Sequence, residues 1–213
     1  TLECSSHALW LERLAGCVFD VAVFLNLTRD HLDDHGTMEA YFEEKAKPFA
    51  LLKPGGRAVV NADDAWGRKL LERLPRERTL SFSLSASAGA DVTGEVRPSA
   101  EGISLRMVRH ETGDVVEIAS PLVGAPNAEN LLAAASAALA LGLDPGQIGT
   151  RLGCVSKVPG RLEMVPNEMG LLVLVDYAHK PAALEGVLKT TRALASSRGG
   201  ALHVVFGCGG DRD

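Results

Sequence analysis

A nearly continuous apolar run, FDVAVFLNL at residues 19–27, limits the folds open to this chain. Runs of this kind are typical of parallel strands buried on both faces, because helices cover such a sheet from either side. A helix is expected at 37–52, ended by the segment KPGG at 53–56, and a short buried strand at 57–61 follows it. This order of strand, helix and strand predicts an α/β domain built around a mostly parallel sheet.

The same alternation continues and then changes in the middle of the chain. Asp63 or Asp64 can cap a helix that reaches about residue 73, and the next strand is predicted at 79–84. Three further segments alternate apolar and polar residues and are joined by turn signals. They predict a small antiparallel sheet with one face in water, formed by residues 91–98, 102–109 and 115–119.

Helices and a second α/β pattern are expected in the rest of the chain. A long Ala- and Leu-rich helix is predicted at 128–141, with Asn127 as a candidate N-cap. Asp144 caps a second helix that reaches about residue 152, with Pro145 at its first position. After a linker at 157–160, the pattern begins again with predicted strands at 161–165, 171–176 and 202–206 and a helix at 181–195.

We therefore expect two domains, residues 1–157 and residues 158–213, of which the second begins a Rossmann-like α/β domain. The chain has no initiator Met and stops within a glycine turn, so we expect it to be a fragment.

Composition excludes several classes of function. A net charge of −5 gives no electrostatic footprint for nucleic acid. Neither a secretory leader nor a sufficiently long apolar run occurs, so no membrane association is expected. The four cysteines are scattered without a C-x-x-C pair, which is typical of reduced thiols in a cytoplasmic protein. We expect a cytoplasmic monomer.

Lys45 stands where an apolar residue is expected. It falls seven residues after Met38, on a stripe of apolar side chains at helical spacing that also includes Tyr41, Phe42 and Phe49. A lysine on such a stripe must reach water, find a partner or be chemically altered. A solvated surface lysine remains the alternative, because Pro48 is expected to kink or break the helix after about Ala46.

Other side chains with metal or ligand chemistry lie near predicted strand ends. Glu3 is placed at the end of a short strand, where α/β proteins hold Mg²⁺. His31 and His35 would share a helical face, but no Glu follows His31 as in H-E-x-x-H, so a capping or loop role is equally open. Asp176 follows an apolar strand, which is again a position that favours ligand contact.

The glycine turn at 207–210 resembles half of a dinucleotide-binding fingerprint. Its third glycine would fall at Arg212, so the fingerprint fails. The turn nevertheless leaves a nicotinamide-dependent oxidoreductase as one alternative function.

Seven segments taken together resemble the Mur ligase family, most closely its UDP-N-acetylmuramoyl-tripeptide synthetase branch. They occur in the family's order and with similar spacing over essentially the whole chain. The segments are ECSSH at 3–7, NLTRDHLDDHGTME at 26–39, NADD at 61–64, GAPNAEN at 124–130, PGRLE at 159–163, DYAH at 176–179 and FGCGGDRD at 206–213.

The resemblance implies an ATP-dependent amide ligase of peptidoglycan precursor synthesis. In this family ATP phosphorylates the carboxylate of a UDP-N-acetylmuramoyl peptide, here the dipeptide. The amine of the incoming amino acid, diaminopimelate or lysine, then attacks the acyl phosphate. Mg²⁺ and positioned cations stabilise the charge that develops during phosphoryl transfer. Residues 1–157 would be part of the central ATP-binding domain, and residues 158–213 the start of the amino-acid-binding domain.

The resemblance also implies roles for individual residues. Lys45 matches a carbamylated lysine that holds Mg²⁺ together with Glu3 and His31, and these three are the predicted catalytic and metal residues. His35 has no such role and is expected to be structural. The predicted ATP contacts are Asn127 and Asn130 at adenine, Arg161 at the nucleotide and Asp176 at ribose. The predicted substrate contacts are Ser5 and Arg13 at the UDP-muramoyl group and Arg212 at the amino acid.

A phosphate-cradling loop of the form G-x-x-x-x-G-K-[ST] does not occur in these 213 residues. The resemblance implies that it lies upstream of Thr1, so we expect these residues alone to show no ligase turnover. Besides the oxidoreductase, two alternatives remain open. One is folylpolyglutamate synthase or another Mur branch, and the other is a non-catalytic remnant that only binds a partner.

Overall fold

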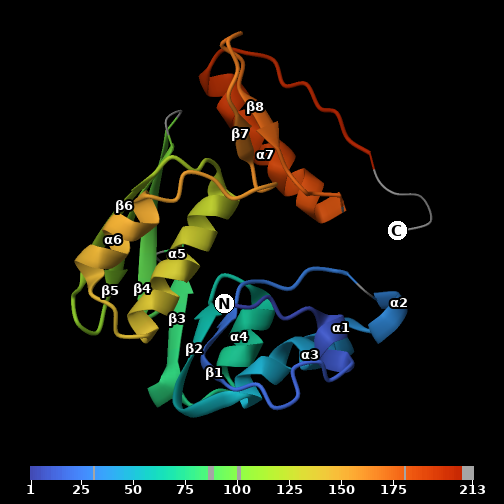
Figure 1. The fold of residues 1–213 in the computed structure, drawn as a ribbon, viewed down its shortest axis with the longest axis vertical. Coiled ribbons are helices and arrows are strands. Elements are labelled where there is room, and N and C mark those ends of the chain that lie inside the picture. Colours follow the sequence, from blue (N-terminus) through green and yellow to red (C-terminus); the bar gives the residue numbers. More distant parts are fainter. Residues whose placement is uncertain (31, 86–88, 100–101, 180, 208–213) are drawn as a thin grey trace.

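The computed structural model describes residues 1–30, 32–85, 89–99, 102–179 and 181–207, and their strands form two sheets (Figure 1). The larger sheet has six strands in sequence order. Its first four strands are mutually parallel, and the last three form an antiparallel meander. The strands are β1 (Phe19–Phe24), β2 (Leu52–Asn61), β3 (Thr79–Ser83), β4 (Val92–Ser99), β5 (Gly102–Arg109) and β6 (Val115–Ser120).

The predicted α/β fold class is confirmed, and the meander proves to continue the parallel sheet. The join is short, because β3 pairs with β4 only through Phe82 opposite Val92 and Ser83 opposite Thr93. From there β4 turns into the antiparallel ladder with β5. One sheet therefore carries both patterns that the sequence predicts.

Helices cover both faces of the parallel strands. On one face lie α3 (Met38–Ala50) and α4 (Ala65–Leu71), and on the other lies α5 (Ala125–Ala140), while α6 (Pro145–Gly153) packs against α5 and β6. Within β2 the side chains of Ala58 and Val60 belong to the hydrophobic core under α3 and α4, whereas Val59 belongs to the core under α5. This division follows from the two-residue period of a strand.

Side-chain caps begin the helices near the sheet. The Thr37 hydroxyl accepts a hydrogen bond from the Ala40 N–H at 3.1 Å and starts α3. Asp64, one of the two predicted caps, accepts from the N–H groups of Trp66 and Gly67 and starts α4. Each cap satisfies amides that have no partner within the helix.

Two sequence predictions about helix ends are wrong. The predicted N-cap of α5, Asn127, lies inside the first turn, because the helix begins at Ala125 after Gly124. Gly124 has a φ of 91°, which favours glycine, and Pro126 suits a first turn that needs no amide donor. Helix α3 also continues past Ala46 to Ala50. The buried Pro48 lies inside the helix, and the helix ends two residues after it.

The second sheet is a pair of short antiparallel strands, β7 (Glu163–Val165) and β8 (Val173–Val175), followed by α7 (Pro181–Ser197). The strand predicted at 202–206 is wrong. Residues 201–207 have no regular structure, and Val205 is fully exposed. A strand needs a hydrogen-bonded neighbour, and in the described residues β7 and β8 pair only with each other.

The short strand predicted around Glu3 is also wrong. Residues 1–5 are irregular and lead directly into the short helix α1 (Ser6–Trp10). Beside it lies another short helix, α2 (Leu32–His35), at the same end of the molecule as α3 (Figure 1). In the described part of the chain, no helix is both long and apolar enough to cross a membrane.

The close approach of α4 to the end of β2 predicts opposite effects for two helical glycines. A Cβ at Gly67 would lie 2.0 Å from the backbone oxygen of Asn61, whereas a Cβ at Gly186 in α7 would meet open space. We expect Gly67→Ala to lower the free energy of unfolding by about 1–3 kcal/mol, because the helix must shift. Gly186→Ala should raise it by about 0.5–1 kcal/mol. Urea denaturation followed by circular dichroism measures both, and equal effects would contradict the packing at Gly67.

Candidate functional site

Lys45 directs its amino group from α3 toward the amino-terminal segment. Its Nζ donates a hydrogen bond to the backbone oxygen of Cys4 at 3.0 Å, and the side chain is half-buried. Burial lowers the pKa of the Lys45 ammonium, although the charges of Glu3, Cys4 and Asp30 act in the opposite direction. The lysine therefore lies between an apolar helix face and a group of acidic side chains.

Of the three predicted metal ligands, the structure describes Lys45 and Glu3. The Glu3 carboxylate is close enough to act on the charge of Lys45, and it is exposed at the surface. Asp30 acts on the same lysine from the loop after β1, and His31, the next residue, lies outside the described residues. A lysine with a lowered pKa more readily supplies the neutral amine from which a carbamate forms.

Within the described ranges, no group of three or more His, Cys, Asp or Glu side chains is placed to hold a metal ion. The predicted set includes a lysine and His31, so this finding does not address it.

Side-chain contacts connect α1 to α2 and α2 to α3, the helix that carries Lys45. The Nε2 atom of His7 in α1 lies 3.0 Å from the Asp34 carboxylate in α2. The ring of His35 stacks on that of Tyr41 in α3, with centroids 5.2 Å apart. His35 of α2 thus packs against α3.

The two asparagines predicted to hold adenine point in different directions. Asn127 is 2% exposed, and its Nδ2 donates to the backbone oxygens of Val123 at 2.9 Å and of Arg161 at 3.3 Å. Asn130, one turn further along α5, is exposed. Only Asn130 is therefore available to a ligand in this structure, whereas Asn127 ties α5 to the segment that precedes β7.

Asp176 and Arg161 meet at this same junction. The Asp176 carboxylate accepts from the N–H of Leu162 and from the N–H of Ala178, both at 2.8 Å. Leu162 has a φ of 48°, a conformation that costs free energy for a branched residue and must be held by its surroundings. Arg161 is exposed, and its guanidinium lies 5.9 Å from the centroid of the Tyr177 ring.

The three predicted substrate contacts are less well defined. The Ser5 hydroxyl accepts from the Ala8 N–H at 3.1 Å and caps α1. Arg13 is exposed in the turn that follows this helix. Arg212 lies outside the described residues.

Glu129 in α5 is a polar residue that the sequence analysis missed. The side chain is half-buried, its Oε1 accepts from Asn61 Nδ2 at 2.8 Å, and it also forms a hydrogen bond with Asn26. Burial raises the pKa of the Glu129 carboxyl, and the nearby charges of Asp63 and Asp64 add to this effect. The available signal was that the segments containing Asn26, Asn61 and Glu129 all belong to the family pattern.

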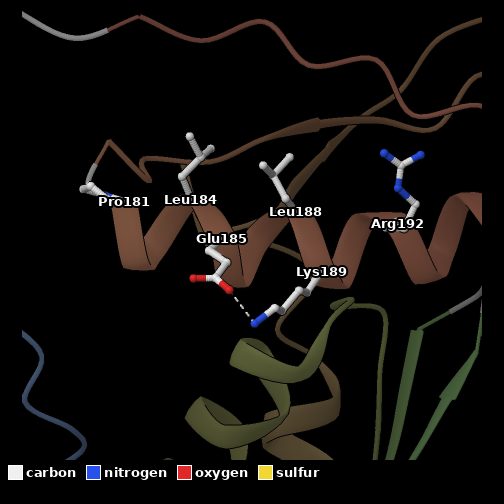
Figure 2. Close-up of a pocket in the computed structure, with 6 residues that line it drawn as sticks. All are labelled: Pro181, Leu184, Glu185, Leu188, Lys189 and Arg192. Carbon is white, nitrogen blue, oxygen red and sulfur yellow. Dashed lines mark ion pairs between the residues drawn. The ribbon is translucent and has the colours of Figure 1, made fainter.

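A shallow groove elsewhere runs along α7 (Figure 2). Leu184 and Leu188 project from the same side of the helix, and Glu185 pairs with Lys189 at 2.6 Å on another. All six lining residues come from this one helix, and none is a predicted site residue. The groove is therefore distinct from the groups gathered around Lys45 and α5.

Two family profiles match the chain. The Mur ligase middle domain matches residues 1–138, and the glutamate ligase domain of Mur ligases matches residues 160–213.

Individual relatives agree with these matches. The chain is 47% identical over 219 residues to a UDP-N-acetylmuramoyl-L-alanyl-D-glutamate–2,6-diaminopimelate ligase of Geobacter metallireducens, covering all of this chain and 41% of the relative. The ligase of the same name from Gloeobacter violaceus is 46% identical over 214 residues, covering all of this chain and 42% of the relative. A solved structure of such a ligase superposes with a TM-score of 0.73 at 38% identity, covering all of this chain and 43% of that one. The chain thus spans about two fifths of these relatives.

The different settings of the two asparagines predict different effects on stability. Asn127→Ala leaves the Val123 and Arg161 oxygens without their buried donor, so we expect it to lower the free energy of unfolding by about 1–3 kcal/mol. Asn130→Ala removes an exposed amide and should change the free energy of unfolding by less than about 0.5 kcal/mol. Thermal and urea denaturation of the two variants test this, and equal losses would contradict the buried role of Asn127.

Proposed function

Because this chain belongs to the Mur ligase family, we propose that it contributes the metal-binding and adenine-binding parts of an ATP-dependent ligase that extends a UDP-N-acetylmuramoyl peptide. The reaction joins an amino acid to the peptide's carboxylate through an acyl phosphate. The names of the relatives support UDP-N-acetylmuramoyl-L-alanyl-D-glutamate as the acceptor and diaminopimelate as the added amino acid. They favour this reaction over that of folylpolyglutamate synthase, and family membership favours a ligase over the oxidoreductase alternative.

The observation that carries this proposal is the setting of Lys45. Its amino group lies half-buried beside Glu3 and Asp30, and burial lowers the pKa of its ammonium. A lysine that gives up its proton can add CO₂ through its nitrogen, and the resulting carbamate is an anion. Carbamylated Lys45 would then hold Mg²⁺ with Glu3 and His31. The metal supplies charge stabilisation for phosphoryl transfer.

The other proposed roles follow the positions of the remaining side chains. Asn130 presents its amide to adenine, and Arg161 presents an exposed guanidinium to the nucleotide. Asn127 supports Arg161 through its backbone oxygen. Asp176 is proposed to contact the ribose. Its carboxylate also holds the turn at Leu162, directly after Arg161.

Ser5 and Arg13 are proposed to bind the UDP-muramoyl substrate, and Arg212 the incoming amino acid. We also propose that the two domains meet between residues 157 and 158, which is supported by the separation of the two sheets.

A ligase assay tests the proposed reaction. A protein that contains these residues together with a phosphate-binding loop is incubated with ATP, Mg²⁺, the muramoyl dipeptide and diaminopimelate, and the products are identified by mass spectrometry. Parallel reactions contain lysine as the amino acid, or folate as the acceptor. We expect the muramoyl tripeptide and an equal amount of inorganic phosphate only in the first reaction.

In the same assay Lys45→Ala should lower kcat by at least about a hundredfold, because charge stabilisation during phosphoryl transfer is lost. Lys47→Ala is the matched control, since Lys47 is exposed on the same helix and pairs with Glu44. Equal activity in the two variants would reject the role of Lys45. If turnover occurs only in the reaction that contains folate as the acceptor, the proposed substrate is rejected.

The carbamate itself can be observed without turnover. With ¹³C-bicarbonate, we expect one carbamate resonance in the carbon NMR spectrum at neutral to mildly alkaline pH. It should disappear in Lys45→Arg, because guanidinium remains protonated and does not add CO₂. A resonance that persists in Lys45→Arg would place the modification on a different amine.

A further inference from the structure

The carboxylate of Glu129 lies between two parts of the proposed site that are distant in the sequence. It belongs to the first turns of α5, between Asn127 and Asn130. Its side chain is half-buried near the carboxyl ends of β1 and β2. A carboxylate taken out of water loses hydration and must recover hydrogen bonds from the protein.

Two asparagine side chains supply those hydrogen bonds. Asn61 is the last residue of β2 and is 3% exposed. Its Nδ2 donates to Glu129, while its Oδ1 accepts from the Asp63 N–H at 2.9 Å. Both ends of this amide are thus in use, so its orientation is fixed. The second partner, Asn26, follows β1 and stands five residues before His31.

The neighbouring acidic residues are held by other donors. Asp63 accepts from the Ser83 hydroxyl at 2.6 Å and from the Leu84 N–H at 2.7 Å. Asp64 accepts from N–H groups at the start of α4. Asp64 also accepts from the Leu27 N–H in the loop after β1, at 3.5 Å. Asp63, Asp64 and Glu129 therefore have separate sets of donors, and Asn26 and Asn61 are those of Glu129.

We propose that Glu129 is a positioning residue that connects the nucleotide-side helix α5 to the loop leading to His31. This inference rests on the proposed function, because it assigns Glu129 a role toward the metal and nucleotide parts of that site. In the first turns of α5, Asn127 forms a hydrogen bond with the backbone of Arg161. Two residues further on, Glu129 forms a hydrogen bond with Asn26, in the loop that leads to His31. A displacement of either part then displaces Asn130.

Hydrogen exchange measured without any ligand tests the link directly. We expect Glu129→Ala to speed amide exchange in residues 25–30, because Asn26 loses its carboxylate partner. Asn26→Ala should speed exchange in the same segment, and the double variant should be no faster than either single variant. The control is Glu117→Ala, which removes an exposed carboxylate on β6 that pairs with Arg106. It should leave this segment unchanged.

Manganese binding provides the functional readout, with Mn²⁺ as the probe for the proposed site. Residues that orient metal ligands without touching the metal typically change metal affinity by about tenfold or more, and we expect a loss of this size in Glu129→Ala. Glu129→Gln keeps the side chain's size and one acceptor oxygen, so it should lose less. If Glu129→Ala does not fold, the Gln and Asn26 variants provide the same comparison.

If residues 25–30 exchange as slowly in Glu129→Ala as in the wild type, the proposal is overturned. It is also overturned if the two single substitutions increase the exchange rate additively in the double variant. Failure of the wild-type chain to bind Mn²⁺ would count against the metal part of the proposed function. The exchange measurements would still decide the link, because they need no metal.

Discussion

The burial of β2 on both faces is the constraint on which the rest of this structure depends. Val59 packs under α5, while Ala58 and Val60 pack under α3 and α4. A strand covered in this way can meet water only near its ends, so the polar side chains gather where β1, β2 and β3 finish. Asn61, Asp63 and Glu129, on which the proposed site depends, lie at that edge.

Several charged groups near this edge have specific hydrogen-bond partners. The acidic residues after β2 bind backbone and hydroxyl donors, Glu129 binds two asparagine amides, and Lys45 binds the backbone oxygen of Cys4. Such pairing offsets the free-energy cost of burial and also fixes orientation. The segments connected in this way are the ones that carry the proposed nucleotide and metal contacts.

The connection to the second sheet combines polar and apolar contacts. Asn127 reaches from α5 to the backbone of Arg161, and Asp176 holds the strained turn at Leu162. The glycine at 124 allows a close approach, since a Cβ there would lie 2.6 Å from a methyl group of Leu162. Small changes at this junction therefore act on the start of α5 and on the exposed side chain of Arg161 together.

The sequence by itself determined the α/β pattern, the antiparallel meander, the cap Asp144 and the placement of Lys45 on an apolar helix face, and it narrowed the cap of α4 to Asp63 or Asp64. These features depend on residues close together in the chain, where periodicity and local hydrogen bonding decide the outcome. Only the tertiary structure decided that Asn127 turns toward Arg161 and that Glu129 meets Asn61 from 68 residues away. It also decided that residues 202–206 form no strand, because strand formation depends on a neighbour that local sequence does not specify.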